Sequence, residues 1–430
     1  MLQKDRSGQV LTGASALAAE KYQQALDAYY CYAGDPMGCL QAATEDSPGF
    51  LMAHVLSAYL SLIGTNAEAA AAGVAAFEAA AALPGSEREL GHVEALRRLL
   101  AGEIAGAART LEAVTITEPR DVLALQVGQV LDFLLGDSRM LRDRIGRALP
   151  HWSRSMPEHH AVLGMLAFGL EETGHYDRAE DAGLEALSLE RRNGWAQHAV
   201  AHVFEMQDRR AEGVAFMRAD IDAWTRESFF QVHNWWHLAL FHLGQGEAHE
   251  ALKLFDGPIF QARSDMALDL VDAASMLWRL QLHGVDVGDR WAPVADIYEA
   301  KAMGGAYAFD DAHAMMAFVG AGRTEAQAEL LQAQARAVGD NVGMVRDVGL
   351  PVLRALQAFG SGDYARVLEN LRPVRNIAAR FGGSHAQRDL IDLTMIEAAS
   401  RGGDQALHAA LLAERQAAQP LARRRFHQAA

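Results

Sequence analysis

The chain has 430 residues, of which 50% are hydrophobic, and a formal net charge of −16 at pH 7. This negative charge excludes a general nucleic-acid or anionic-membrane surface, because neutralising phosphates requires clustered Lys and Arg side chains. Only 11 prolines interrupt a sequence rich in strong helix formers, so the composition predicts an all-α protein.

Cysteine content and hydrophobic segments indicate the compartment. Cys31 and Cys39 are too few for a disulfide framework, and they are typical of reduced cytosolic thiols. The sequence shows neither a basic segment followed by an apolar run at its start nor an uncharged apolar stretch long enough to span a bilayer. We therefore expect a cytoplasmic protein with no membrane span and no nucleic-acid partner.

A glycine recurs between amphipathic helical segments along the chain, at a spacing of 34 to 40 residues. Asp208 takes its place once, and the glycines are Gly64, Gly102, Gly136, Gly174, Gly246, Gly284, Gly322, Gly362 and finally Gly402 or Gly403. Glycine suits a left-handed turn between two helices, and this period is the signature of tetratricopeptide repeats. We predict a tetratricopeptide-like α-solenoid, a right-handed superhelix of about nine or ten helical hairpins.

The repeat predicts one superhelical domain over residues 1–430. Its units are less regular over 1–150, line a pocket over about 151–335, and complete the superhelix over 336–430. The sequence contains no phosphate-binding loop, dinucleotide or flavin fingerprint, or serine-nucleophile motif in the required context. The cofactor that remains open is a divalent transition metal.

The repeat also predicts which side chains share a face. In each unit the first helix lines the concave side, and residues about 13, 10, 6 and 3 positions before the turn residue share its inward stripe. This register places the following polar and aromatic residues on or beside one concave surface: Trp195, His198, His202 and Glu205; His233 and Trp236; Asp272; Asp311 and His313.

Two histidine pairs are spaced four residues apart, His198 with His202 and His233 with His237. Residues i and i+4 of a helix can bind one metal ion, and neutral imidazoles suit zinc, iron or copper. Glu205 could add a carboxylate ligand. The same histidines could instead bind an organic ligand or transfer protons, or they could pack as hydrogen-bonded side chains between helices.

A carboxylate stands close to a histidine at the start of another helix. Asp311 could orient the His313 imidazole and raise its basicity, as a general base requires. The alternative is that Asp310 and Asp311 stabilise the first turn of a helix through its dipole.

Residues 382–389 predict a tight turn into a helix. Ser384 and Gln387 fit a capping box. His385 and Arg388 could hold a carboxylate or phosphate near the helix N-terminus, or Arg388 could pair with Asp389 between repeats.

Six segments together carry a resemblance to a known family. They are residues 163–172, 195–206, 233–241, 272–280, 311–317 and 382–389. In this order they resemble the tetratricopeptide repeat protein 38 family, also called StaR-like proteins, over nearly the whole chain. The resemblance implies a soluble tetratricopeptide-like fold, and a role in hydroxylation during glycopeptide-antibiotic biosynthesis has been suggested for some members. Gln207-Asp208 departs from the Gly-containing turn that looks usual there, and the family supplies no agreed catalytic residues.

We expect a pocket lined by His, Trp and Asp that binds a small molecule, with catalysis there through a metal ion or through histidine acid–base chemistry. The candidate catalytic residues are His198, His202, His233, Asp311 and His313. The candidate ligand-binding residues are Trp195, Glu205, Trp236, Asp272, His385 and Arg388. The candidate metal ligands are His198, His202, His233 and His237. The alternative function is an interaction scaffold whose groove takes a peptide or helix, and the Ala-rich N-terminal units could form a homodimer contact.

Overall fold

The computed structural model describes residues 3–64, 67–301 and 304–418. These residues are mainly helical, apart from a short antiparallel ribbon of β1 (Gln3–Lys4) and β2 (Val10–Leu11). The all-α prediction is confirmed. None of the helices described is both long and apolar enough to cross a membrane.

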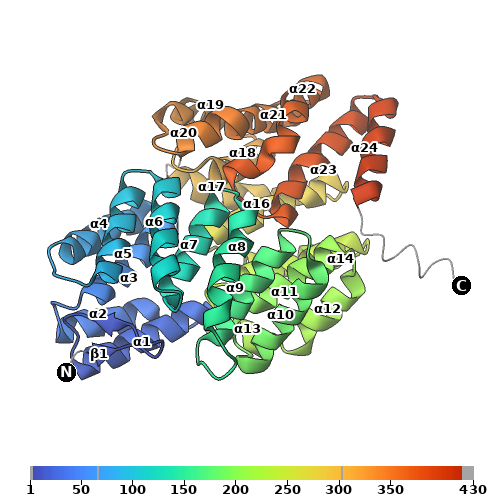
Figure 1. Cartoon of the computed structure of the whole chain (residues 1–430). Coiled ribbons are helices and arrows are strands. Elements are labelled where there is room, and N and C mark those ends of the chain that lie inside the picture. The colour runs from blue at the N-terminus through green and yellow to red at the C-terminus, as the bar shows by residue number, and fades with distance from the viewer. Residues whose placement is uncertain (1–2, 65–66, 302–303, 419–430) are drawn as a thin grey trace, which may run out of the picture.

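Consecutive helices pair as hairpins that follow one another in chain order (Figure 1). Six hairpins form the first part: α1 (Ala16–Cys31) with α2 (Pro36–Asp46), α3 (Leu51–Ile63) with α4 (Ala67–Ala81), α5 (Glu87–Leu100) with α6 (Ile104–Thr117), α7 (Val122–Leu134) with α8 (Ser138–Ala148), α9 (His159–Glu171) with α10 (Tyr176–Leu189), and α11 (Gly194–Met206) with α12 (Arg210–Ala219). Five more follow: α14 (Gln231–Gly244) with α15 (Ala248–Leu254), α16 (Ala267–Leu282) with α17 (Trp291–Ala300), α18 (Ala308–Gly320) with α19 (Thr324–Ala333), α21 (Leu350–Gly360) with α22 (Tyr364–Val374), and α23 (His385–Arg401) with α24 (Gln405–Ala418).

Short helical turns join or extend these hairpins: α13 (Ile221–Thr225), α20 (Asn341–Met344), η1 (Leu149–His151), η2 (Phe255–Ile259), η3 (Gly288–Arg290), η4 (Gln334–Arg336), η5 (Val345–Gly349) and η6 (Arg375–Phe381). The described ranges thus contain eleven hairpins, where the glycine spacing predicts nine or ten. The pair that the glycine series misses is α1–α2, whose turn uses Tyr32 (φ 55°) and Gly34 (φ 77°).

The predicted turn residues do stand between the two helices of each hairpin. From Gly102 to Gly403 the turn glycines have φ between 67° and 81°, in the left-handed region. Asp208 adopts the same conformation with φ 55°, so the hairpin keeps its geometry without a glycine. Gly64 differs, because its φ of −73° is an ordinary right-handed value.

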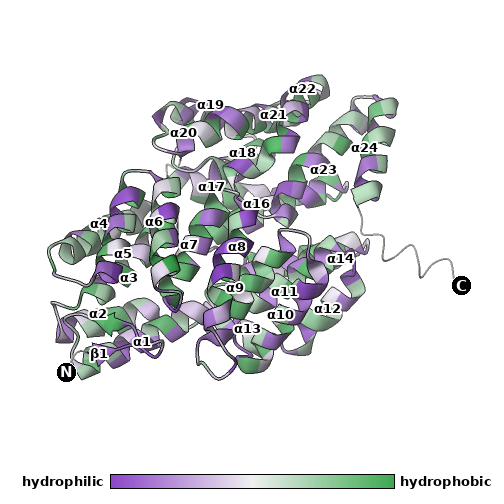
Figure 2. Ribbon diagram, in the orientation of Figure 1, coloured by the Kyte–Doolittle hydropathy of each residue, from purple (hydrophilic) through white to green (hydrophobic). Residues whose placement is uncertain are grey.

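The two helices of a hairpin differ in burial. Nearly every residue of α9, α11, α14 and α18 is buried, whereas only one side of α10, α12 and α22 is. The ribbon coloured by hydropathy shows polar and apolar residues alternating around the peripheral helices (Figure 2). The first helices therefore form an inner layer, as the predicted register requires. Ser384 and Gln387 also form the predicted capping box at the start of α23.

The superhelix closes on itself, because hairpins far apart in sequence touch. The Phe229 amide donates to Tyr32 O at 3.1 Å, and the Asp340 amide donates to Gly102 O at 3.0 Å. The His385 amide donates to Glu172 Oε1 at 2.8 Å, across 213 residues of sequence. Early and late hairpins thus bound one common interior.

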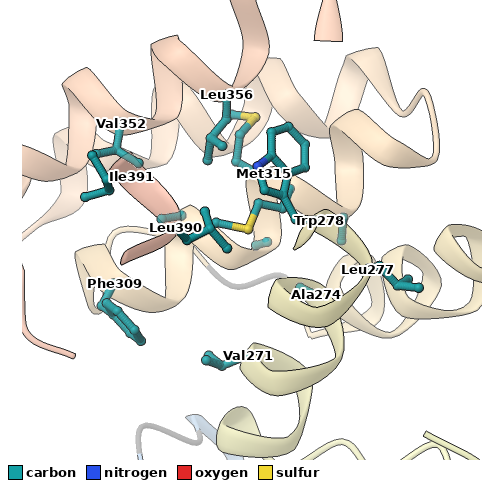
Figure 3. Close-up of a cluster of buried hydrophobic side chains, with 14 of the residues drawn as sticks. Val271, Ala274, Leu277, Trp278, Phe309, Met315, Val352, Leu356, Leu390 and Ile391 are labelled. Carbon is teal, nitrogen blue, oxygen red and sulfur yellow. The ribbon is translucent and has the colours of Figure 1, made fainter. Parts of the chain in front are cut away.

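Much of that interior is a packed core. Side chains of α16, α18, α21 and α23 converge there, with Val271 and Trp278 facing Phe309, Met315 and Leu390 (Figure 3). The Trp278 indole N–H donates to Thr394 Oγ1 at 3.0 Å. In these units most of the inward stripe packs against other helices, whereas Val271 and Phe309 at its start also line a cavity.

Candidate metal centre

Four histidines from two neighbouring inner helices form one cluster, which we call the histidine tetrad. His198 and His202 lie one turn apart on α11, and His233 and His237 lie one turn apart on α14. All four are at most 4% exposed. One nitrogen of each lies within 4.8 Å of the corresponding atom of every other member. The structure therefore brings together the four predicted metal ligands.

The spacing of the rings suits a shared ion. Five of the six pairs have ring centroids separated by 4.3 Å, between His198 and His202, to 5.0 Å, between His198 and His237. The Nε2 atoms of His198 and His233 are 3.1 Å apart. Two imidazole ligands of a tetrahedral Zn²⁺ at 2.0–2.1 Å would place their nitrogens about 3.3 Å apart. The observed separation is close to that value.

Most ring nitrogens of the tetrad have no hydrogen-bond partner among the described residues. Five buried nitrogen atoms are in this position: Nδ1 of His198 and both ring nitrogens of His202 and His237. Burying a polar group without a partner costs about 1–3 kcal/mol by mutational measurements. If the histidines were only hydrogen-bonded packing residues, these five nitrogen atoms would have partners, which they lack.

Two carboxyl groups contact the tetrad from behind. Asp272 accepts from His233 Nδ1, which lies 2.9 Å from each carboxylate oxygen and leaves Nε2 directed at His198. Glu171 Oε2 lies 3.4 Å from His202 Nδ1, without the alignment of a regular hydrogen bond. A carboxylate behind a ligand histidine fixes the ring orientation and makes the ligand nitrogen more basic.

The protonation states suit metal ligation. Burial lowers the pKa of His198 and His237 well below the ordinary value, and the charges of neighbouring histidines lower it further. Burial also lowers the pKa of His202 to about 3, against the opposing effect of Glu172. These three imidazoles are therefore neutral at pH 7, which is the form that binds a metal ion.

Aromatic rings enclose the tetrad. Phe168 lies 5.4 Å from both His198 and His202, measured between ring centroids. Trp236 stacks on His233 at 5.3 Å and donates its indole N–H to Ser275 Oγ at 2.8 Å. The site is thus dry and rigid, as transition-metal centres with a fixed geometry require.

A cavity of about 420 Å³ adjoins the tetrad. Its lining includes His198 and His233 but neither His202 nor His237. The other lining residues come from α1, α3, α4, α7, α11, α16, α18, the start of α23 and the turns around Tyr32 and Phe229, so early and late hairpins both contribute. The volume lies within the range of about 300–1,000 Å³ for small-molecule sites.

The predicted ligand-binding residues are divided among three places. Trp195 lines the cavity, whereas Trp236 and Asp272 are buried against the tetrad and do not. Glu205, His385 and Arg388 line a second, charged pocket of about 460 Å³. Glu205 is therefore not among the groups brought together with the tetrad.

His385 and Arg388 bind a carboxylate of the chain itself. The His385 imidazole lies 3.0 Å and the Arg388 guanidinium 3.4 Å from Glu172 Oε2. Burial raises the pKa of Glu172, but the hydrogen bond and charge of His385 outweigh it and hold that pKa at about 2. Asp389 pairs with Arg415, so the predicted Arg388–Asp389 pair is replaced by two separate ion pairs.

The proposed contact between Asp311 and His313 does not form. Asp311 Oδ2 accepts from the Gly305 amide and from Gln334 Nε2, both at 2.9 Å. His313 Nδ1 hydrogen-bonds to Phe309 O at 2.9 Å instead. The physical reason is that residues two apart on a helix point in different directions. Neither side chain lines the cavity or belongs to the tetrad.

Sequence reasoning missed Glu171 and Phe168 of α9 and the tyrosines of the N-terminal hairpins. The register that identified His198 and His202 would have found the first two, because Phe168 and Glu171 stand 6 and 3 positions before the turn residue Gly174. Tyr29, Tyr32 and Tyr59 carried no such signal. They reach the cavity only because the superhelix closes.

No protein-family model matches the sequence. One solved structure similar to this chain is the crystal structure of the tetratricopeptide repeat domain of P58(IPK). It shares 12% sequence identity over 74% of this chain and 99% of that chain, with a TM-score of 0.22. The repeat architecture therefore rests on the hairpins and left-handed turns described above.

Proposed function

We propose that this protein binds one transition-metal ion in the histidine tetrad and a small molecule in the adjoining cavity. The single observation that carries the proposal is the set of five buried ring nitrogens without hydrogen-bond partners in a cluster of four histidines. A metal ion would accept one lone pair from each imidazole, and so would satisfy one of the two orphaned nitrogens of His202 and one of the two of His237. His198 and His233 would be both metal ligands and part of the cavity wall, which is where the bound molecule meets the centre.

The chemistry of the ligand set indicates the kind of metal. Four imidazole ligands favour zinc, copper, iron or nickel over magnesium or calcium, which prefer oxygen ligands. Burial raises the pKa of both Asp272 and Glu171, and a divalent ion beside them would favour their ionised forms, whose two negative charges match its own formal charge. Metal-dependent catalysis on the small molecule is the stronger form of the proposal.

A second candidate function needs no metal. His233 holds its Nδ1 proton against Asp272 and presents Nε2 as a lone pair, which is the arrangement of a histidine general base. In this form the cavity ligand would take the place of His198 at His233 Nε2 and lose a proton to that nitrogen.

The peptide-scaffold alternative has less support. It requires a continuous open groove, whereas the inward residues Val271, Ala274 and Trp278 are at most 3% exposed. The finer family assignment, to the tetratricopeptide repeat protein 38 family, is likewise a proposal, supported by the six segments quoted above.

Elemental analysis of the purified protein tests the metal proposal. We expect about one equivalent of a transition metal per chain in the wild type, or after incubation with Zn²⁺, and its loss in His237→Phe. His313→Phe is the matched control, because His313 is also buried and has an unpartnered Nε2 but lies outside the tetrad. Equal metal contents in both variants, or none in wild type after incubation, would contradict the proposal and leave the general-base candidate.

A further inference from the structure

The side chains that line the cavity indicate which charge its ligand can carry. Nine of its side chains are Tyr, Phe or Trp, whereas the residues lining it within the described ranges include no Lys or Arg. Asp310 is the one Asp or Glu among them. A buried anion needs a cation or several donors to replace its water. An anionic ligand would therefore enter this cavity at a high desolvation cost.

A metal ion in the tetrad would not make the cavity more favourable for an anionic ligand. A divalent ion in the tetrad would bring two positive charges beside the cavity, but Asp272 and Glu171 stand directly behind two of the ligand histidines. Ionised beside the ion, these two carboxyl groups would offset its charge locally. The cavity wall thus gains no net positive field that would draw in a carboxylate or a phosphate.

The aromatic wall has a particular geometry. Tyr32 from the turn of the first hairpin stacks on Trp195, with centroids 5.4 Å apart and planes 17° apart. Phe229 and Phe230 pack around Tyr32 at 5.6 Å and 5.0 Å. Aromatic rings attract other rings through offset stacked and edge-to-face contacts beyond the effect of buried area. A flat ring inserted here would find such partners on adjoining walls.

We propose that the ligand of this cavity is an aromatic small molecule that carries no negative charge. The inference rests on the proposed function and narrows it to a chemical class. Because His198 and His233 belong to the same wall, the ring would lie against the tetrad, with any hydroxyl or carbonyl group of the ligand free to meet the histidine edges.

A series of naphthalene derivatives tests this class by calorimetry with metal-loaded full-length protein. We expect naphthalen-2-ol to bind with a Kd at least about tenfold lower than naphthalene-2-carboxylate, which differs from it mainly in charge. We expect the saturated decahydronaphthalen-2-ol to bind about three- to tenfold more weakly, because it lacks the π face. Tighter binding of the carboxylate probe, or equal binding of the saturated one, would overturn the proposal.

Variants locate the binding and separate the two proposals. Trp195→Leu and Phe229→Leu should each weaken naphthalen-2-ol binding, while Tyr364→Leu, a tyrosine outside the cavity, should not. Phe229 lies in a loop before α14 and is only half-buried, so that variant is expected to fold even if Trp195→Leu does not. Metal content is measured on the same samples. Loss of naphthol binding with metal retained assigns the site to this cavity, and unchanged binding in both variants refutes it.

Discussion

Glu171 and Asp272 occupy equivalent positions, because each places a carboxyl group behind one histidine of the tetrad. Asp272 makes a regular hydrogen bond to His233, whereas both oxygens of Glu171 are buried without a hydrogen-bond partner among the described residues. Burial raises the pKa of Glu171 well above its ordinary value, and the charge of Glu172 adds to this. Glu171 thus buries its carboxyl group without gaining a hydrogen bond, so packing alone does not explain a glutamate at this position.

We predict that Asp272→Asn and Glu171→Gln each weaken metal binding about 10- to 100-fold, because the ligand histidines lose their orienting carboxylates. Competition titration with a zinc chelator measures the change. Glu205→Gln is the control, since Glu205 is buried nearby but does not belong to the tetrad. If Glu205→Gln weakened binding as strongly as the other two variants, Glu205 would be a ligand after all.

The individual residues of the site show what the sequence could reveal. The i, i+4 spacing identified all four histidines, because both pairs lie on regular helices and the turn residue fixes their direction. Asp272 was also found, since it stands next to the inward stripe. The partners of Asp311 were not predictable, because the Gly305 amide comes from a loop and Gln334 from another helix.

At the scale of helices, a buried ion network joins α5 to α7. Asp121 caps α7 by accepting from the Ala124 amide, and it also pairs with Arg88 at 2.8 Å and His92 at 2.9 Å. Burial would raise the pKa of Asp121, but the charge and hydrogen bond of His92 and the charge of Arg88 outweigh it and hold that pKa well below its ordinary value. The carboxylate therefore stabilises the folded state.

We predict that Asp121→Asn lowers the free energy of unfolding by about 3 kcal/mol at pH 7, because it leaves two buried basic groups without their charge partner. A folded pKa below the unfolded value of about 3.9 gives stability that is present above pH 4 and lost as the pH falls. The difference from wild type should thus shrink toward pH 3. Urea denaturation at both pH values measures it, with the exposed Asp220→Asn as a control that should show no comparable change. If Asp121→Asn lowered the free energy of unfolding equally at both pH values, the charge of Asp121 would not be the cause.

The whole molecule differs from an open solenoid in its closure. The turn at Gly136 lies against η6, and an added Cβ there would stand 1.7 Å from Ala379 O. The turn at Gly174 has nearly the same role in its hairpin, with φ 77° against 67°, but nothing within 4 Å of an added Cβ. The two glycines therefore separate the local requirement for a left-handed turn from the contact that closes the superhelix.

We predict that Gly174→Ala costs about 1–2 kcal/mol through backbone strain alone. Gly136→Ala should cost about 2–5 kcal/mol, because overpacking against Ala379 adds to the same strain. Thermal or chemical denaturation measures both. Equal costs would mean that the contact between these distant hairpins contributes little to stability.

The sequence predicted the hairpins of the fold but not the closure of the superhelix. The glycine period predicted the hairpins, their order and their inner helices, since each is a local property of about 38 residues. It did not predict that Tyr32 would reach Trp195, because that contact depends on small rotations summed over several units. The tetrad lies within two neighbouring units and was therefore foreseeable, as was the part of the cavity wall formed by Trp195, His198 and His233, whereas the wall contributed by both ends of the array was not.

The contact between Tyr32 and Phe229 has a consequence for folding during synthesis of the chain. In an open repeat array each unit depends mainly on its neighbours, so the chain can fold in steps as it leaves the ribosome. Here the loop of the first hairpin bonds across 196 residues, to Ser228 just before α14. Tyr32 therefore gains these contacts only after more than half of the chain has been synthesised, and a nascent protein cut short before α14 would have neither cavity nor tetrad.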